Sequence, residues 1–343
     1  MTEPREPVAD LKRIAFLLEA LQEPGYRVRA FRSAATALAG LGPDEVAERA
    51  ATGRLRELTG IGEVTERTIL ESLRGETPVY LRRLEASEGK PQAQGAAELR
   101  AALKGDLHAH TEASDGHFTI AEMAEAAIEL GHEYLVITDH SPRLTIANGL
   151  STERLMAQLD EIERLNRELA PFRLLTGIEV DINEDGSLDQ SDEVLSRLDV
   201  VVGSSHSALR MPSAPMTRRM VTALANPRLD VLGHCTGRMK RRRRNRPEST
   251  FDAEIVFAAA AKFDKAIEIN CLPDRLDPPK RLLRLAVESG CRVSIDSDAH
   301  YTGQLAWVRV GCERAHLCGV TPEMIVNATA ADELLAWTAA HEA

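Results

Sequence analysis

Two histidines separated by one residue, His108 and His110, lie in a segment whose composition suits a metal site. The segment runs from Gly105 to Gly116 and ends in Ser-Asp-Gly. On a β-strand, residues i and i+2 point to the same side, so both imidazoles face one way. Two converging neutral imidazoles form half of a metal site, and Asp115 is close enough to fold back as an oxygen ligand. Taken alone, the pair is equally compatible with two surface histidines near a strand end.

Seven short β-rich runs follow residue 105 and alternate with helical stretches. Such alternation is typical of parallel strands joined by crossover helices. The nearly continuous apolar run at Asp199–Val202 fits a strand that is buried on both faces. Seven strand–helix units predict an α/β barrel. The runs lie near Asp106–His110, Leu135–Asp139, Leu174–Val180, Val200–His206, Val231–His234, Ala266–Asn270 and Val293–Asp296.

Polar residues stand at the carboxyl ends of these runs. In a parallel α/β barrel all strands deliver their last residues to one rim, which carries the functional site. Six of the ten histidines fall just where an apolar run ends, which favours a metal site over a random scatter. The other four, His117, His132, His316 and His341, are expected to be structural or exposed. The polar residues at the strand ends are His108, His110, Asp139, His140, Glu179, Asp181, His206, His234, Glu268, Asn270, Asp298 and His300.

This pattern resembles the polymerase and histidinol phosphatase (PHP) family, and most of all the PHP domain of bacterial X-family DNA polymerases. The resemblance covers almost all of residues 105–310, and all nine positions of the family's metal ligands hold ligating residue types. Cys235, where relatives often have proline, is the main departure near the site. The matching motifs are His108-Ala109-His110, Ser114-Asp115-Gly116, Thr138-Asp139-His140, Gly177-Ile178-Glu179-Val180-Asp181, Ser205-His206-Ser207, Gly233-His234-Cys235-Thr236-Gly237-Arg238 and Ser297-Asp298-Ala299-His300.

The resemblance implies a distorted (β/α)7 PHP barrel that holds three divalent metal ions. It assigns His108, His110, Glu179 and Asp298 to one ion, Glu179, His206 and His234 to a second, and Asp115, His140 and His300 to a third. The mixed imidazole and carboxylate set suits zinc, manganese or iron and does not choose between them. Asp106, Asp139 and Asp181 are equally compatible with orienting these ligands and with capping turns.

The resemblance further implies a hydrolase acting on phosphoric ester bonds, in which a metal-activated water attacks phosphorus. Glu179, Asp298 and Arg238 are the expected catalytic residues. Arg238 opens a basic run that ends at Arg246 and follows the His234 strand, so it should begin on the rim. We expect Arg238 to hold a substrate phosphate and Arg241, Arg242, Arg243 and Arg244 to attract DNA. The alternative is a solvated charge run.

The N-terminal region predicts several short helices. Gly60 and Gly62 precede a helix in Leu-Thr-Gly-Ile-Gly, where open backbone N–H groups can bind a phosphate of DNA. With Arg27–Arg32, this stretch resembles a helix-hairpin-helix module and the N-terminal domain of X-family polymerases. The alternative is an ordinary helical turn, and the charge of Glu63 opposes a phosphate there. No lysine lies between Lys12 and Lys90, which argues against Schiff-base lyase chemistry.

The composition suits a cytoplasmic protein of two domains. The predicted organisation is a helical domain at 1–85, a linker at 86–104 and a PHP domain at 105–343. No apolar run approaches the roughly 20 residues of a membrane span, and the charged N-terminus lacks the core of a signal peptide. The five cysteines form no C-x-x-C pair and are expected to be reduced. The net charge of −11 argues against broad coating of nucleic acid.

Three functions are compatible with these features. The leading one is a metal-dependent phosphoesterase acting on DNA ends or nucleotides, in DNA repair or nucleic-acid processing. The second is a small-molecule phosphomonoesterase, such as a histidinol phosphatase or a nucleoside monophosphate phosphatase. The third is a non-catalytic DNA-binding module. The expected partner is a phosphorylated substrate, with DNA as one candidate and no membrane, and the sequence does not indicate an oligomeric state.

A polymerase palm does not fit between the two predicted domains, because even a small domain takes roughly 50 residues. We therefore expect no template-dependent extension of a labelled primer with any nucleotide and Mg²⁺ or Mn²⁺. Extension by purified protein, in a gel assay calibrated with a known polymerase, would contradict this organisation.

Overall fold

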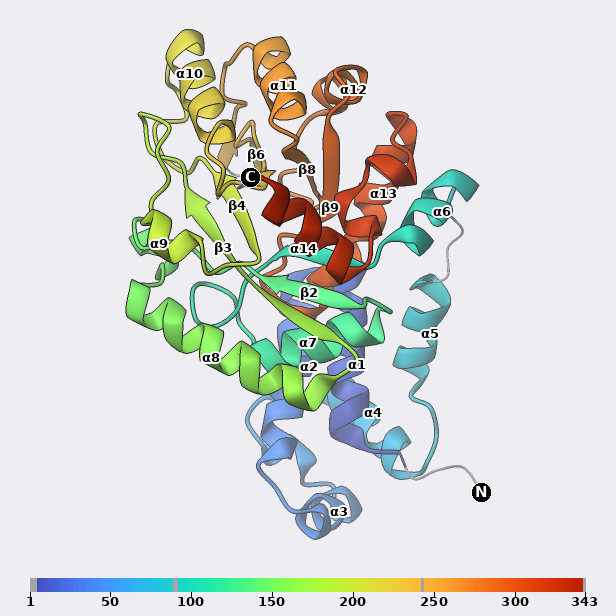
Figure 1. Cartoon of the computed structure of the whole chain (residues 1–343). Helices are drawn as coiled ribbons and strands as arrows, with labels where there is room; N and C mark the ends of the chain where they lie inside the picture. Colours follow the sequence, from blue (N-terminus) through green and yellow to red (C-terminus); the bar gives the residue numbers. More distant parts are fainter. Residues whose placement is uncertain (1–4, 89–91, 242–243, 342–343) are drawn as a thin grey trace. The chain divides into compact units, whose positions relative to one another are not determined.

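The computed structural model of the chain describes residues 5–88, 92–241 and 244–341 (Figure 1). The chain divides into two compact units, residues 1–91 and residues 92–343. Within the described residues, no helix combines the length and apolar character needed to cross a membrane. All five cysteines are buried and carry free thiols.

The first unit consists of short helices around a small apolar core. Helix α1 packs against α2, α4 and α5, and it buries Leu11, Ile14 and Leu18 at the i, i+3, i+7 spacing of one helical face. Gly60 has a φ of +98° in the turn before α4, a conformation that favours glycine. The helices are α1 (Pro7–Ala20), α2 (Gly25–Ala39), α3 (Pro43–Ala51), η1 (Leu55–Glu57), α4 (Glu63–Leu73) and α5 (Val79–Glu88).

The second unit is a parallel seven-stranded barrel, which confirms the predicted fold class. The strand order is β1-β2-β3-β4-β5-β8-β9, and every pair of hydrogen-bonded neighbours is parallel. Nearly all the strand side chains are buried, as expected for a sheet covered by helices, and Arg292 at the start of β9 is exposed. The strands are β1 (Gly105–Ala109), β2 (Tyr134–Ile137), β3 (Arg173–Asp181), β4 (Val200–Ser204), β5 (Val231–Leu232), β8 (Ala266–Asn270) and β9 (Arg292–Asp296).

Helices connect the strands and surround them in Figure 1. Helix α6 (Gln94–Ala102) packs against α13, so most of the predicted linker at 86–104 belongs to the second unit. The other helices are α7 (Ile120–Glu129), α8 (Thr152–Leu169), α9 (Asp192–Leu195), α10 (Ser213–Leu224), α11 (Ala253–Lys262), α12 (Lys280–Glu288), α13 (Val308–Leu317) and α14 (Ala331–Ala340), with 3-10 segments η2 (Thr145–Ala147), η3 (Thr302–Trp307), η4 (Pro322–Met324) and η5 (Val326–Ala328).

Side-chain carboxylates help to close the barrel between β1 and β9. In the described residues a single backbone bridge joins Ala109 to Ala299, just after β9. The backbone N–H of Leu107 donates to Asp296 at 2.9 Å, and Asp106 accepts a backbone N–H from the segment after β9 at 3.1 Å. Burial raises the pKa of both carboxyls, that of Asp106 to about 6. At this contact between β1 and β9, which we call the seam, buried carboxylates therefore accept backbone N–H groups that backbone carbonyls accept in the other strand pairs.

The basic run after His234 forms a small antiparallel hairpin rather than an open loop. Its strands are β6 (Met239–Arg241) and β7 (Arg244–Arg246). The backbone N–H of Lys240 donates to Asp274 O at 2.6 Å, which attaches the hairpin to the segment after β8. Of the arginines predicted to attract DNA, Arg242, Arg243 and the side chains of Arg241 and Arg244 lie outside the described residues.

The loop after β2 gives a prediction for stability, because it passes very close to its own start at Gly149. A Cβ added there would lie 1.9 Å from the carbonyl oxygen of Ser141, so Gly149→Ala should lower the free energy of unfolding by about 1–3 kcal/mol in denaturant titrations. Gly40→Ala is the control, because a Cβ there meets nothing within 4 Å. An unchanged midpoint for Gly149→Ala would contradict the close approach.

Candidate metal centre

Six histidines and three carboxylates meet at the carboxyl ends of the strands. Six of these nine side chains are buried, while Asp115, His206 and His300 are partly exposed. The structure thus brings all nine predicted ligands to one rim of the barrel. His108 lies on β1, His110 directly follows it, and Asp115 lies in the loop after β1. Glu179 lies on β3. The remaining ligands follow strand ends: His140 follows β2, His206 follows β4, His234 follows β5, and Asp298 and His300 follow β9.

Glu179 lies at the centre of the cluster, with histidines on both of its carboxylate oxygens. Its Oε1 lies 2.8 Å from His234 Nε2 and 3.3 Å from His206 Nε2. Its Oε2 lies 2.8 Å from His140 Nδ1 and 3.4 Å from His108 Nε2. One carboxylate therefore faces two separate groups of imidazoles, which is the arrangement a bridging ligand needs.

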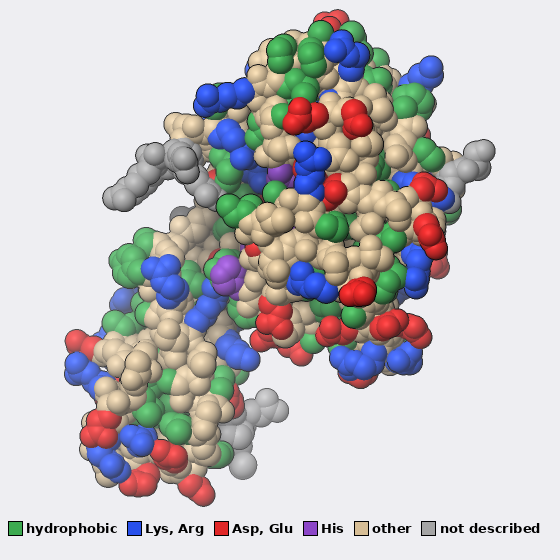
Figure 2. Space-filling model, turned by 90° about the vertical axis from the view of Figure 1, so that its left-hand side faces the viewer, with side chains coloured by type: hydrophobic (Ala, Val, Ile, Leu, Met, Phe, Trp, Pro, Cys, Tyr) green, Lys and Arg blue, Asp and Glu red, His purple; other side chains and the backbone are tan. Residues whose placement is uncertain are grey.

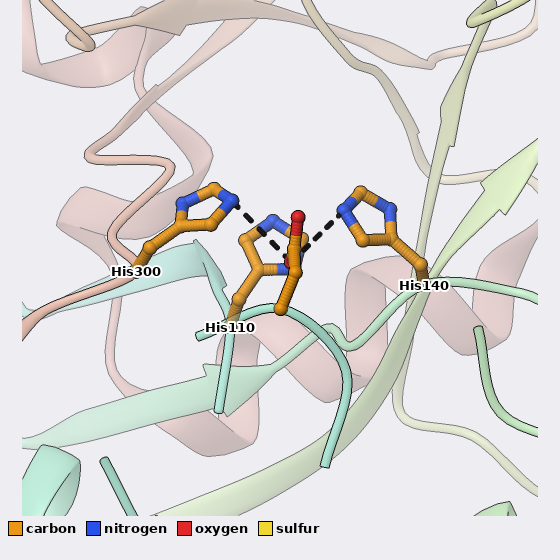
Figure 3. Close-up of side chains that lie close together, drawn as sticks. His110, His140 and His300 are labelled. Atoms are coloured by element: carbon orange, nitrogen blue, oxygen red, sulfur yellow. Dashed lines mark ion pairs between the residues drawn. The ribbon is translucent and has the colours of Figure 1, made fainter. Parts of the chain in front are cut away.

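A second carboxylate, Asp115, lies between two imidazoles at the outer side of the cluster. Its Oδ1 is 3.3 Å from His140 Nε2 and 3.4 Å from His300 Nε2. Figure 3 shows His110, His140 and His300 converging from three different chain segments, and the His110 ring centroid is 4.4 Å from each of the other two. Ligand atoms of these four residues lie within 4.8 Å of one another, close enough to share one ion.

Asp298 turns back into the rim through a strained backbone. Its φ of +55° lies in the left-handed region, which is unusual for a residue other than glycine and is often found at functional sites. Its Oδ1 lies 3.3 Å from His110 Nε2 and 3.9 Å from His108 Nε2. Asn270 donates to its Oδ2 at 3.0 Å, and Arg275 Nε lies 3.2 Å from the same oxygen.

The charges of the cluster are strongly coupled. Burial alone would raise the pKa values of Glu179 and Asp298, but the surrounding histidine charges hold both well below their usual range. Burial lowers the pKa of His140, but Glu179 and Asp115 outweigh it and raise that pKa to about 10. Burial and the charges of His140 and His300 lower the pKa of His110 to about 4. The carboxylates are thus ionised, and a cation that binds His140 must displace its proton.

Two further carboxylates hold the imidazoles in place. Glu268, on β8, lies 2.6 Å from His108 Nδ1 and accepts the backbone N–H of His234 at 2.5 Å. Asp181 accepts the backbone N–H of His206 at 3.0 Å and lies 3.4 Å from His206 Nδ1. Such contacts fix which ring nitrogen is free for a metal. Glu268 stands at a strand end in the sequence, but its position there does not reveal this role.

The other two aspartates considered as orienting residues hold the backbone instead. Asp139 accepts from Thr111 N at 2.8 Å and from Gln158 Nε2 at 2.6 Å, so it fixes the loop after β1. Asp106 accepts the backbone N–H of His108 at 3.0 Å and belongs to the seam between β1 and β9. Only Asp181, of the three, lies against a candidate ligand's imidazole in the described residues.

The cluster carries an unusual number of buried polar atoms that form no regular hydrogen bond, although several of them lie against one another as ion pairs. In the described residues these atoms include Nε2 of His108, both ring nitrogens of His110 and of His206, and Oε2 of Glu179. Buried polar groups normally form hydrogen bonds, so donor atoms that converge in this way fit a bound cation. Their chemistry, imidazole nitrogen and carboxylate oxygen, fits divalent transition metals.

Arg238, expected to hold a substrate phosphate, contacts main-chain oxygens in the structure. This buried side chain donates to the carbonyl oxygens of Arg275, at 2.9 Å, and Leu276, and it lies 3.5 Å from Glu248 Oε1. Its Nε and one terminal nitrogen are therefore engaged by main-chain oxygens. Arg275 lies against the cluster: its Nε forms an ion pair with Asp298 Oδ2 at 3.2 Å, and its buried Nη1 has no hydrogen-bond partner in the described residues.

The two glycines predicted to bind DNA belong to the first unit. The backbone N–H of Gly62 donates to Thr65 Oγ1 at 2.9 Å and begins α4. Gly60 approaches Ser33 on α2, where an added Cβ would lie 3.1 Å from its carbonyl oxygen. The turn is thus packed against α2, and its role in binding DNA stays a prediction.

Comparison with known proteins identifies both units. A family model for the PHP domain matches residues 106–271, and one described as a helix-hairpin-helix domain matches residues 4–78. A probable phosphatase of Caldanaerobacter subterraneus subsp. tengcongensis is 30% identical over 218 residues, which cover 60% of this chain and 79% of that protein. The chain belongs to the PHP family. Its enzyme class is accordingly a hydrolase acting on phosphoester bonds.

A second relative relates the PHP domain to X-family polymerases. The DNA polymerase/3'-5' exonuclease PolX of Bacillus subtilis (strain 168) is 41% identical over 226 residues, 66% of this chain and only 39% of that protein. This match lends support to the predicted resemblance. A crystal structure of histidinol phosphate phosphatase from Lactococcus lactis overlaps with a TM-score of 0.44 at 15% identity, covering 64% of this chain and 94% of that one.

The central position of Glu179 gives a prediction about metal content. Glu179→Gln keeps the shape of the side chain but removes the charge shared by the histidines, so the variant should retain clearly less metal than wild type by elemental analysis after dialysis. Glu254→Gln, on the exposed part of α11, is the matched control and should keep its metal. Equal metal content in Glu179→Gln and wild type would rule out the bridging role.

Proposed function

We propose that this PHP hydrolase acts on DNA ends or nucleotides with three divalent ions, zinc, manganese or iron, at the strand-end cluster. The observation that carries the proposal is the set of buried imidazole nitrogens and carboxylate oxygens that converge around Glu179 without forming regular hydrogen bonds. The assignment of the nine ligands to three ions is part of the proposal. It is supported by Glu179, which has imidazoles on both oxygens, and by the separate grouping of Asp115 with His140 and His300.

Divalent ions in such a centre lower the pKa of a bound water and neutralise the charge of a phosphoryl group. The protein's own side chains do the rest. Glu179 and Asp298 stay anionic in the buried cluster, and Glu268 and Asp181 keep His108 and His206 oriented. The rim therefore presents a rigid ligand set that needs little rearrangement to receive a phosphate.

Arg275 is the side chain that we expect to hold the phosphoryl oxygens. Its guanidinium borders the cluster through the Nε contact with Asp298, and its buried Nη1 donor has no hydrogen-bond partner in the described residues. Guanidinium groups bind phosphate through paired, charge-assisted hydrogen bonds. Arg238 holds this arginine's loop through two carbonyl oxygens, one of them on Leu276, whose φ is +47°. We therefore assign phosphate binding to Arg275 and a positioning role to Arg238.

Three features favour DNA over a small phosphomonoester. The first unit matches a helix-hairpin-helix domain, the relative from Bacillus subtilis carries the name of a polymerase and exonuclease, and a basic hairpin follows β5. Basic and acidic side chains are interspersed over the face in Figure 2, so we expect DNA to be bound locally rather than along a broad surface. Five buried free thiols support a cytoplasmic location as part of the proposal.

A small-molecule phosphatase is the second candidate, because the relative from Caldanaerobacter is named a probable phosphatase. A substrate screen with Zn²⁺, Mn²⁺ and Fe²⁺ separately, covering single-stranded DNA, 3′-phosphate ends, nucleotides and histidinol phosphate, separates the two. Turnover of histidinol phosphate alone would overturn the DNA proposal. DNA binding without any turnover would favour a non-catalytic DNA-binding module.

The roles proposed for the two arginines, phosphate binding by Arg275 and positioning by Arg238, give a prediction for kinetics. Arg275→Gln should lower kcat/KM on every substrate by roughly a hundredfold, because it removes a charged contact that borders the reacting group. Arg238→Gln should also lower activity, and Arg238→Lys should recover part of it, because a single ammonium still reaches one carbonyl. Arg164→Gln, on the exposed face of α8, is the control with the same charge change. Full activity of Arg275→Gln would contradict the assignment.

A further inference from the structure

Two aromatic side chains beside the metal centre form a stacked pair. The rings of His117 and Tyr301 lie with centroids 4.0 Å apart and planes inclined by 20°. Phe118 meets Tyr301 edge-on, at 6.2 Å and 72°. His117 is exposed, and Phe118 and Tyr301 are half-buried. We call His117 and Tyr301 the aromatic platform.

The backbone ties this platform to the candidate ligands. Tyr301 directly follows His300, and the backbone N–H of His117 donates to His300 O at 3.0 Å. His117 also lies two residues after Asp115, in the loop that carries this carboxylate inward. The platform therefore cannot move far without moving the Asp115 and His300 side of the cluster.

The loop beneath the platform is tightly folded. A Cβ added at Gly116 would lie 2.6 Å from His110 O, so the backbone here approaches the end of β1 too closely for a side chain. The backbone N–H of Glu112 donates to Phe118 O at 2.9 Å and closes the loop. These contacts hold His117 in place before any substrate arrives, which lowers the entropic cost of binding against it.

We propose that the aromatic platform stacks the base of the terminal nucleotide whose phosphate occupies the metal centre. Nucleic-acid enzymes commonly hold single-stranded bases on aromatic side chains, because every base has a π-face. A rigid, nearly parallel ring pair fits a flat heteroaromatic base better than it fits a flexible alkyl phosphate. The inference rests on the proposed function, and it narrows the substrate to nucleotides and nucleic-acid ends of any sequence.

The platform and the basic hairpin would contribute in different ways. Stacking depends on ring contact, whereas the hairpin acts through charge and is weakened by salt. The base preference should therefore persist when the salt concentration is raised, while the overall affinity for longer DNA falls.

The test pairs a change in the protein with a change in the substrate. Wild type, His117→Ala and Tyr301→Leu are compared on a short oligonucleotide and on the same oligonucleotide with an abasic terminal residue. The expected kcat/KM of wild type is roughly five- to hundredfold lower on the abasic substrate, the range that one stacked base contributes. Each variant should lose a similar factor on the normal substrate and little more on the abasic one.

Controls separate stacking from damage to the metal centre. His117→Phe keeps a flat ring and should retain the preference for the normal substrate. Turnover of glycerol 2-phosphate, which has no aromatic ring, should change little in all three variants. Equal losses of a variant on glycerol 2-phosphate and on DNA would overturn the proposal, because the rings would then only support His300. Equal turnover of both oligonucleotides by wild type would overturn it as well.

A binding measurement distinguishes failure of the platform from failure of the proposed function. A terminal 2-aminopurine loses fluorescence when it stacks, so its signal should fall on binding to wild type and not on binding to His117→Ala. Quenching without hydrolysis would support the platform and reject the proposed hydrolysis of DNA. Hydrolysis of DNA without quenching would support the proposed function and reject the platform.

Discussion

The buried carboxylate of Glu179 is the interaction on which the second unit depends. An ionised acid inside a barrel is very costly unless opposite charges or hydrogen bonds compensate it. Imidazoles from β1 and from the ends of β2, β4 and β5 surround it, so these four strands must end at the same level along the barrel axis. The parallel order of the barrel meets this requirement, because it sends every strand's last residue to the same rim.

The polar side chains around this centre fall into two kinds: those whose hydrogen bonds are already formed within the chain, and those that still have a donor or acceptor free to bind a ligand. Asp139 and Arg238 have their hydrogen bonds taken up by the chain itself, and they keep loops in place. Arg275 Nη1 and His110 Nδ1 are buried without a hydrogen-bond partner in the described residues. We therefore expect the availability of donors and acceptors, rather than charge or closeness in sequence, to distinguish groups that meet a ligand from groups that support them.

The sequence predicted the barrel and the meeting of its ligands because both follow from one-dimensional patterns. Apolar runs mark the strands, and the histidines that follow five of the seven runs mark the rim, as His206 and His234 do. The roles of Arg238 and Arg275 depend on which carbonyl oxygens the folded loop presents to each side chain. The spacing of residues along the sequence does not reveal these contacts. Glu268 was visible at the end of β8, but its contact with His108 crosses 160 residues of sequence. His117 was set aside because it follows no strand, although a loop returns it to His300.

The seam between β1 and β9 ties the metal centre to the integrity of the barrel. β1 brings His108 and His110 to one side of this seam, and the segment after β9 brings Asp298 and His300 to the other. A cation shared by His110 and Asp298 would span the two edges that the backbone joins only sparsely. The first and last strands would then be fastened by coordination bonds as well as by buried acids. Removal of this cation by a chelator would therefore loosen the contact between β1 and β9, while the other strand pairs would keep their backbone hydrogen bonds.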